Sequence, residues 1–296
     1  MPVCAACGAS ALVPHLQVAT RSTTEAFIPT TDRFGVALGN FVRCRVCGHS
    51  QLDPMPAAAE LEAGYRDAES GDYEAEERGQ RATARAALAQ IERHVARPGR
   101  LADLGCWVGF LPAEAAIRGW RAVGVEPSVW AAERARERGV EVVVAPLLKA
   151  DLPERAFAAV TMGDVIEHLP DPGAVLDRVQ RVLVPGGVVW IATPDAGSRV
   201  ARALGARWWS VIPTHVHLFT RRSLAALLER HGFEVLEVAT SPKSFSVGYY
   251  LGRLGGYRPA LAQSVVAVAQ RLGLAERLWA PDFGDRVAVV ARLRRR

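Results

Sequence analysis

Four of the five cysteines stand in two close pairs, each followed directly by a glycine; they are Cys4, Cys7, Cys44 and Cys47. Four thiolates in two such turns match the tetrahedral ligand set of structural zinc, because the glycine permits the tight turn that points backbone N–H groups at sulfur. Two disulfide bonds are the alternative, but they require an oxidising compartment. We therefore predict one structural zinc ion with four protein ligands and no open position for catalysis.

A second stretch combines a glycine turn with two acidic residues. Leu101–Gly105 is an apolar run typical of a buried strand, and a turn with Gly105 and Gly109 leads into apolar residues at helical spacing. Glycines there let backbone N–H groups approach a ligand at the positive end of a helix. Asp103 lies in the first strand and Glu126 ends the second, at the spacing that lets a carboxylate accept the ribose hydroxyls of a nucleoside. Turn capping is the alternative role for Asp103.

The loop Asp103-Leu-Gly-Cys-Trp-Val-Gly109 resembles the Asp-x-Gly-x-Gly-x-Gly loop of class I S-adenosylmethionine-dependent methyltransferases. Three later stretches are similar to signatures of the same superfamily, in the expected order: Asp164–Pro172, Leu183–Gly187 and Pro213–Thr220. The resemblance covers roughly residues 80 to 293. It implies an enzyme that uses S-adenosylmethionine, with a cofactor site formed by Asp103, Gly105, Cys106, Gly109, Glu126 and Asp164.

One position departs from the family pattern, because Trp107 replaces the middle glycine of the loop. The indole could narrow the cofactor site, or the loop could turn it outward as packing. A loop that keeps its fold but binds the cofactor poorly is the alternative, and the chain would then be a non-catalytic binding protein.

The sequence also predicts acid–base groups at strand ends, where a doubly wound sheet binds its ligands. Asp164, Glu167 and His168 follow the fourth expected strand, and His215 follows the fifth. Methyl transfer from a sulfonium is an in-line displacement, so a hydroxyl acceptor must be aligned and must lose its proton. We therefore predict a catalytic set of Asp164, Glu167, His168 and His215.

The same residues resemble the magnesium-binding pattern Glu-x-x-Glu-His…His of small-RNA 2′-O-methyltransferases and some ubiquinone-pathway O-methyltransferases, with Asp164 in place of the first glutamate. The resemblance implies that Mg²⁺ could bind an acceptor diol and lower its pKa. A histidine acting directly as the base and a purely structural role for these residues are the alternatives.

From Leu101 onward, apolar strands alternate with helices, which predicts an α/β fold with a parallel sheet covered on both faces. Strands are expected at 100–105, 120–126, 140–145, 157–163, 187–193, 233–240 and 285–293. Helices are expected at 109–119, 128–138, 171–184 and 221–231. The predicted fold class is a doubly wound, mostly parallel, seven-stranded Rossmann-like sheet with a small N-terminal zinc-ribbon module. The resemblance implies that the last strand inserts antiparallel.

The chain is predicted to have three parts. Residues 1–55 form the zinc module, and residues 56–98 form a helical connection that covers the cofactor site. Tyr65 and Tyr73 could line that site, with exposed or core positions as the alternative. Residues 99–296 form the methyltransferase domain, in which the insert 241–284 supplies aromatic side chains on the side where acceptors enter.

The composition limits the kinds of partner that we expect this protein to bind. Half of the 296 residues are apolar, and the net charge of +5 comes from scattered arginines, which is weak support for nucleic acid binding. An apolar run near eighteen residues is absent from the sequence, and so is an N-terminal stretch of signal-peptide shape. We therefore expect a cytoplasmic location and no membrane partner; the sequence does not indicate the oligomeric state.

The acceptor is predicted more coarsely than the reaction. Zinc-knuckle methyltransferases of this outline resemble enzymes of sugar, polysaccharide or natural-product tailoring, but the sugar C-methyltransferases among them carry a long C-terminal domain that this sequence lacks. We therefore expect O-methylation of a small hydroxylated acceptor such as a sugar, glycoside or natural-product intermediate. An RNA methyltransferase that docks through its zinc module is the alternative, although Val3–Val13 shows neither clustered basic residues nor stacking aromatics.

Overall fold

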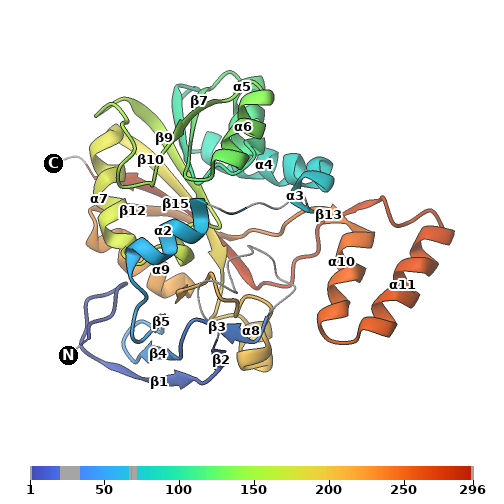
Figure 1. Ribbon diagram of the computed structural model, residues 1–296. Coiled ribbons are helices and arrows are strands. Elements are labelled where there is room, and N and C mark those ends of the chain that lie inside the picture. The colour runs from blue at the N-terminus through green and yellow to red at the C-terminus, as the bar shows by residue number, and fades with distance from the viewer. Residues whose placement is uncertain (1, 21–33, 67, 69–71, 295–296) are drawn as a thin grey trace.

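The computed structural model describes residues 2–20, 34–66, 68 and 72–294, and its centre is a sheet of seven strands (Figure 1). In chain order these are β6 Arg100–Leu104, β7 Arg121–Glu126, β8 Glu141–Val144, β9 Phe157–Gly163, β10 Leu183–Pro194, β12 Phe233–Thr240 and β15 Arg286–Leu293. Their order across the sheet is β12-β15-β10-β9-β6-β7-β8. The last strand, β15, runs antiparallel to the other six, which are parallel to one another. The predicted doubly wound, mostly parallel sheet is confirmed.

Helices cover both faces of this sheet. The main ones are α4 Glu77–Glu92, α5 Phe110–Ile117, α6 Val129–Glu137, α7 Pro172–Val182 and α9 Arg221–Arg230. On one face α7 and α9 bury Val179 and Leu227, and on the other face α4 and α5 bury Leu88 and Ala115. The strands between them are apolar on both sides, which is the pattern that a sheet covered on both faces requires. The helices fall within a few residues of their predicted positions.

The N-terminal residues form a second, smaller sheet that includes one strand from much later in the chain. Its strands are β1 Leu12–Leu16, β4 Phe41–Cys44, β5 Ser50–Leu52 and β11 His217–Leu218, in that order. The strand β11 pairs antiparallel with β5, with His217 opposite Gln51. The predicted division at residues 55 and 98 stays a prediction, but this pairing ties the N-terminal module to the loop between β10 and α9. Nothing in the sequence indicated it.

Short elements complete the chain. They are β2 Ala19–Thr20, β3 Val36–Ala37, α2 Ala58–Arg66, α3 Asp72–Ala75, α8 Arg199–Leu204, β13 Phe245–Ser246, α10 Val247–Arg253, α11 Pro259–Arg271 and β14 Leu278–Trp279. The insert forms a helical hairpin of α10 and α11, which projects from the body beyond the paired strands β13 and β14 (Figure 1). Within the described ranges, no helix has the length and apolarity needed to cross a bilayer.

The start of α5 requires a glycine for two separate reasons. Gly109 caps this helix with a φ of 84°, and a Cβ there would lie 2.7 Å from the Cβ of Ala135 on α6. Gly119 has a similar φ of 87° but nothing within 4 Å of a built Cβ. The two positions therefore separate backbone strain from a packing clash.

We predict that Gly119→Ala lowers the free energy of unfolding by about 1–2 kcal/mol, the cost of a left-handed backbone for an L-residue. Gly109→Ala should cost about 1–3 kcal/mol more, because the added methyl group also overpacks the α5–α6 contact. Urea denaturation of both variants measures the difference. Equal losses would show that the contact with α6 relaxes without cost.

Candidate functional site

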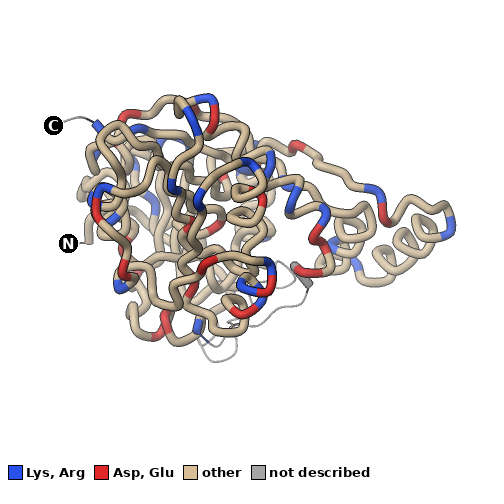
Figure 2. Tube along the Cα trace, turned by 90° about the horizontal axis from the view of Figure 1, so that it is seen from above, with Lys and Arg blue, Asp and Glu red and all other residues tan. Residues whose placement is uncertain are grey.

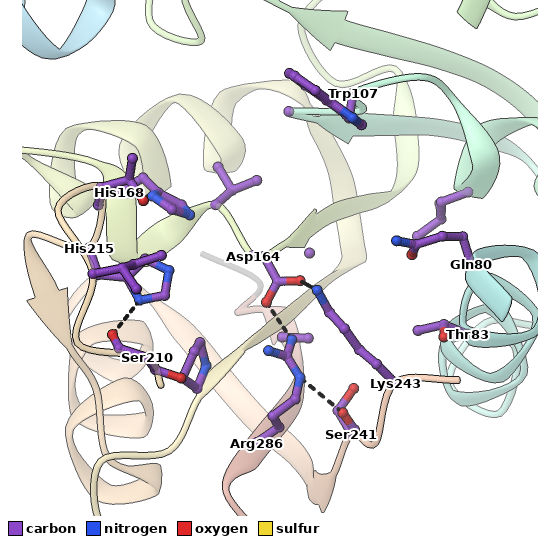
Figure 3. Close-up of a pocket in the computed structure, with 18 of the residues that line it drawn as sticks. Gln80, Thr83, Trp107, Asp164, His168, Ser210, His215, Ser241, Lys243 and Arg286 are labelled. Carbon is purple, nitrogen blue, oxygen red and sulfur yellow. Dashed lines mark hydrogen bonds and ion pairs between the residues drawn. The ribbon is translucent and has the colours of Figure 1, made fainter. Parts of the chain in front are cut away.

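A cavity of about 870 Å³ lies at the carboxyl ends of the parallel strands. Residues that end β7, β9 and β10 line it, as do the glycine loop after β6, helices α2 and α4, and the insert; among them are Glu126, Gly163 and Pro194. A crevice in this place is where doubly wound sheets bind their ligands. Figure 3 shows its interior, with Trp107 facing Asp164, Lys243 and Arg286 across the open space.

Two buried carboxylates mark one end of the cavity. Asp103 accepts a hydrogen bond of 2.6 Å from the hydroxyl of Thr161. Glu126 accepts the backbone N–H groups of Trp107 at 2.8 Å and Ser128 at 2.9 Å, one on each oxygen. Carboxylate oxygens have about four acceptor sites between them, so Glu126 keeps capacity for further donors. The sequence predicted that Asp103 and Glu126 lie together, and both line this cavity.

Burial raises the pKa of Asp103 and of Glu126 to about 7. The negative charge of Glu126 adds to the shift of Asp103. Folding therefore holds two acids in a place where ionisation is costly, and hydrogen-bond donors from a ligand would stabilise their charged forms.

The glycine loop is shaped by close contacts. Gly105 has a φ of 72°, and a Cβ there would lie 2.6 Å from Val165 in the loop after β9. Trp107 also has a left-handed backbone, with a φ of 49°, and its ring lies 5.6 Å from that of Trp130. The sequence left open whether this indole faces the cofactor site or packs outward. It lines the cavity with one part and packs on α6 with another.

The other two predicted loop residues face α5 and α6. Cys106 is buried against Ala113 and Ala135, although it also borders the cavity. Gly109 is not among the residues that line the cavity, and its neighbours are Ala135 and Val140. Packing explains both residue types without a ligand.

The predicted catalytic residues separate into two groups. Glu167 and His168 lie on a short 3-10 helix, Ile166–His168, and His215 lies in the loop before β11; one ligand atom from each of the three lies within 4.8 Å of the others. Asp164 instead forms ion pairs with Lys243, at 2.5 Å, and with Arg286 (Figure 3). Burial alone would raise the pKa of Asp164, but the two cations outweigh it and hold the pKa well below its usual range.

Backbone carbonyls fix the protonation of both histidines. The Nδ1 atom of His168 lies 2.8 Å from the carbonyl oxygen of Thr214, and that of His215 lies 2.8 Å from the carbonyl oxygen of Ser210. A carbonyl only accepts, so Nδ1 of His215 carries the proton and its Nε2 offers a lone pair. Nδ1 of His168 also lies 2.6 Å from the Tyr65 hydroxyl, which donates to the Thr214 carbonyl at 3.4 Å. This network is satisfied when the Tyr65 oxygen accepts from Nδ1–H, which again leaves the lone pair on Nε2. Burial lowers the pKa of His168 to about 4 and that of His215 well below its ordinary value, so both rings are neutral at pH 7.

Glu167 is the least satisfied polar group of the site. Its side chain is 1% exposed, and neither carboxylate oxygen has a hydrogen-bond partner in the described part of the chain. Burial and the charge of Asp164 raise the pKa of Glu167 to about 8. A carboxylate left without donors beside two imidazole lone pairs has the donor set of a divalent cation site.

Three side chains at the site carried little or no signal in the sequence. The hydroxyl of Tyr65 on α2 lies 2.6 Å from Nδ1 of His168, a position that the sequence offered only as one of several. Lys243 and Arg286 come from the insert and the last strand, and nothing in the sequence linked them to Asp164. Tyr73 lies outside the described side chains.

The base of the insert is clamped to α4 above the cavity. Glu76, which precedes α4, accepts the backbone N–H of Ser246 at 2.7 Å and its hydroxyl at 2.6 Å. The Thr83 hydroxyl accepts the N–H of Ser244 at 2.9 Å. A Cβ at Gly79 would lie 2.3 Å from the carbonyl oxygen of Ser244, so the two segments pack in backbone contact. Residues 76–83 and 244–246, which are far apart in the sequence, thus pack together as the roof of the cavity.

The four N-terminal cysteines converge outside this cavity. The sulfur of Cys4 lies 3.6 Å from that of Cys47, and the sulfur of Cys7 lies 3.6 Å from that of Cys44; all four are thiols. A tetrahedral zinc with Zn–S bonds of about 2.3 Å separates its sulfurs by about 3.8 Å. The geometry therefore fits the metal that the cysteine spacing indicated.

The fold and the cavity define a class of enzyme, and the comparisons agree. Residues 74–238, more than half of the chain, match the family model of a methyltransferase domain. The protein belongs to this family and is a class I S-adenosylmethionine-dependent methyltransferase.

Its relatives are similar over part of their length. The ubiquinone biosynthesis O-methyltransferase of Pseudomonas putida strain W619 is 29% identical over 164 residues, which are 50% of this chain and 70% of the relative. That of Pseudomonas putida strain F1 is 33% identical over 143 residues, 44% of this chain and 61% of the relative. The chain thus spans 61–70% of these two proteins.

One solved structure is similar in fold over most of the chain. It is the Burkholderia thailandensis 1,6-didemethyltoxoflavin-N1-methyltransferase with bound 1,6-didemethyltoxoflavin and S-adenosylhomocysteine. It is 21% identical, has a TM-score of 0.53, and the alignment covers 85% of this chain and 97% of that one.

We predict that the affinity for S-adenosylhomocysteine falls as the pH drops from 8 to 6, because protonated Glu126 accepts the ribose hydroxyls more weakly than the carboxylate does. Glu126→Gln should bind more weakly, by roughly 1.5–3 kcal/mol at pH 8, the scale of a hydrogen bond to a charged group. It should also flatten the pH dependence. Calorimetric titration at each pH measures both effects.

Glu141→Gln, at the exposed start of β8, is the matched control and should keep the parent profile. If Glu126→Gln binds as tightly as the parent at pH 8, this carboxylate does not hold the cofactor.

Proposed function

We propose that the enzyme transfers a methyl group from S-adenosylmethionine to a hydroxyl group of a small acceptor such as a sugar, glycoside or natural-product intermediate. The observation that carries the proposal is the pair of neutral histidines, His168 and His215, each with Nδ1 fixed by a carbonyl and Nε2 left to accept a proton. The similarity to two O-methyltransferases supports the reaction class.

The cofactor would lie at the glycine-loop end of the cavity. Asp103 and Glu126 would accept its hydroxyl and amino protons, and Gly105 would keep the backbone close to it. When bound, S-adenosylmethionine supplies an electrophilic methyl group on a sulfonium. The roof that α4 and the insert form would shield part of the cavity from water, which strengthens the polar contacts beneath it.

The acceptor would lie between the histidines and the insert. His168 or His215 would take the hydroxyl proton on Nε2 while the acceptor oxygen attacks the methyl carbon, and the electrons of the breaking C–S bond stay on sulfur. Tyr65 would hold the ring of His168 in place through its 2.6 Å hydrogen bond. Phe245, Tyr249 and Tyr250 line the acceptor side and would form an aromatic wall for a phenol or the apolar face of a sugar, in which Phe245 and Tyr249 stack on each other at 4.2 Å.

The unpartnered carboxylate of Glu167 favours a second version of this chemistry. Glu167, His168 and His215 would hold a divalent cation that lowers the pKa of the acceptor hydroxyl. Asp164, which the resemblance placed in the same ligand set, is paired with two cations, so three protein ligands would hold the ion. Two imidazoles and one carboxylate suit manganese, iron or zinc better than magnesium.

We predict that His168→Ala and His215→Ala each lower kcat by roughly 10²–10⁴, the usual value of a general base, while the affinity for S-adenosylhomocysteine stays within a factor of two. The assay follows S-adenosylhomocysteine release with sugars, glycosides and phenols as acceptors. His15→Ala, on the exposed side of β1, is the control and should keep full activity.

If both cavity variants keep full turnover on the preferred acceptor, the histidine assignment is wrong. If EDTA abolishes parent activity and manganese or magnesium restores it, the cation version replaces the direct base.

We further propose that Cys4, Cys7, Cys44 and Cys47 bind one structural zinc ion. Metal analysis of the parent should give one zinc per chain, and Cys44→Ser should lose it and lower the thermal stability of the N-terminal module, because zinc binding contributes directly to folding. Cys106→Ser, outside the cluster, should keep its zinc. Disulfide-bonded cysteines in freshly isolated protein would contradict the proposal.

A further inference from the structure

The hairpin of α10 and α11 extends away from the body in two perpendicular views (Figures 1 and 2). Helix α11 and its capping residue Leu272 carry exposed apolar side chains along one stripe: Leu261 is 49% exposed, Val268 54% and Leu272 65%. Positions seven and eleven residues after Leu261 lie on the same side of a helix. A soluble helix usually turns such a stripe toward a core, so this one is unpartnered in the monomer.

The charge of the hairpin is of one sign. Between Ser241 and Ala275 the sequence holds four basic side chains and no acidic one; the basic ones are Lys243, Arg253, Arg258 and Arg271. Arg258 and Arg271 are both exposed, and they stand at the two ends of α11. The whole chain, by contrast, has 36 basic and 31 acidic residues. Directly after this range, Glu276 and Arg277 offset each other, so the stripe is flanked by net positive charge.

The positive charge helps to decide whether the stripe binds a second copy of the chain or an anionic surface. A two-fold contact that packs α11 against α11 of a second copy would bring like charges together, because the charged side chains of both hairpins are all basic. An anionic surface complements both arginines. Basic side chains beside an apolar stripe are also typical of helices that lie in the interface of a bilayer.

Exposed apolar side chains also lie where the insert borders the cavity. Leu254, Trp279 and Phe283 are 38%, 47% and 50% exposed, and all three line the cavity wall. A surface that bound the hairpin would therefore lie next to the side of the cavity that the insert forms.

We propose that the α10–α11 hairpin binds the surface of an anionic lipid bilayer through the apolar stripe of α11, with Arg258 and Arg271 contacting lipid phosphates. Binding would place the insert side of the cavity against the membrane, so an acceptor dissolved in lipid could enter it. The docking does not depend on the proposed O-methylation. The sequence predicted no membrane partner because no segment can span a bilayer, but a helix that lies in the interface needs none.

Flotation of the full chain with lipid vesicles tests the docking without any acceptor. The protein should float with vesicles of phosphatidylcholine and phosphatidylglycerol in a 7:3 ratio at low salt, and it should not float with pure phosphatidylcholine. The double variant Arg258→Gln/Arg271→Gln should bind roughly 30-fold more weakly, because each basic side chain near an anionic surface contributes about a factor of five. Val268→Asn/Leu272→Asn should weaken binding roughly tenfold or more by removing the apolar contact.

Matched controls lie on the body. Arg181→Gln at the end of α7 and Ile117→Asn at the end of α5, which is 74% exposed, should leave flotation unchanged. All variants should bind S-adenosylhomocysteine like the parent, which shows that they are folded. The proposal is overturned if the parent does not float with anionic vesicles, if it floats equally with neutral ones, or if Val268→Asn/Leu272→Asn instead dissociates a dimer and leaves flotation unchanged.

Discussion

The backbone pairing of β5 with β11 is the contact on which the active-site geometry depends. The N–H of Leu52 donates to the carbonyl of Val216 at 3.0 Å, and the N–H of Val216 donates to the carbonyl of Glu167 at 2.9 Å. His215 adjoins this ladder, so its ring is placed by a strand of the cysteine-bearing sheet. A zinc ion bound at the cysteines would act on the chemistry by keeping this sheet and its contacts with the β11 segment rigid, and not through any open coordination position.

Three carboxyl groups of the cavity are buried where ionisation is unfavourable. Asp103, Glu126 and Glu167 all have pKa values raised by burial, to about 7, 7 and 8. Because each folded pKa lies above its unfolded value, ionisation of these groups costs folding free energy as the pH rises from about 4 toward 8. The folded chain without ligands thus carries a strain that the donors of a cofactor, or a cation beside Glu167, would relieve.

Sequence patterns were sufficient to predict the sheet and the end of the cavity that holds Asp103 and Glu126. Leu101–Gly105 and Phe157–Gly163 are apolar runs between turn residues, and runs of this kind identify strands without any tertiary information. Asp103 and Glu126 were predictable because the carboxyl ends of adjacent parallel strands must meet at one edge.

Contacts between distant segments were not predictable in the same way. The ion pairs of Asp164 depend on where the insert returns to the sheet, and the hydrogen bond of Tyr65 to His168 depends on how α2 crosses the cavity. Neither follows from local periodicity. The resemblance grouped Asp164 with Glu167 because of their spacing, whereas the left-handed backbone of Asp164, with a φ of 56°, accompanies a side chain paired with Lys243 and Arg286 instead.

The clamp between α4 and the insert limits how this enzyme can be diversified. Acceptor-binding inserts look like exchangeable parts, since they join the sheet at only two points. Here Ser244 and Ser246 are bonded to Thr83 and Glu76, and Gly79 leaves no room for a side chain beneath them. A transplanted insert without a serine at position 246 would remove the hydroxyl donor of Glu76, and a proline at position 244 or 246 would also remove a backbone N–H donor. An exchanged insert would therefore need its matching α4 segment, so the two segments, one from each side of the glycine loop, would have to be exchanged together.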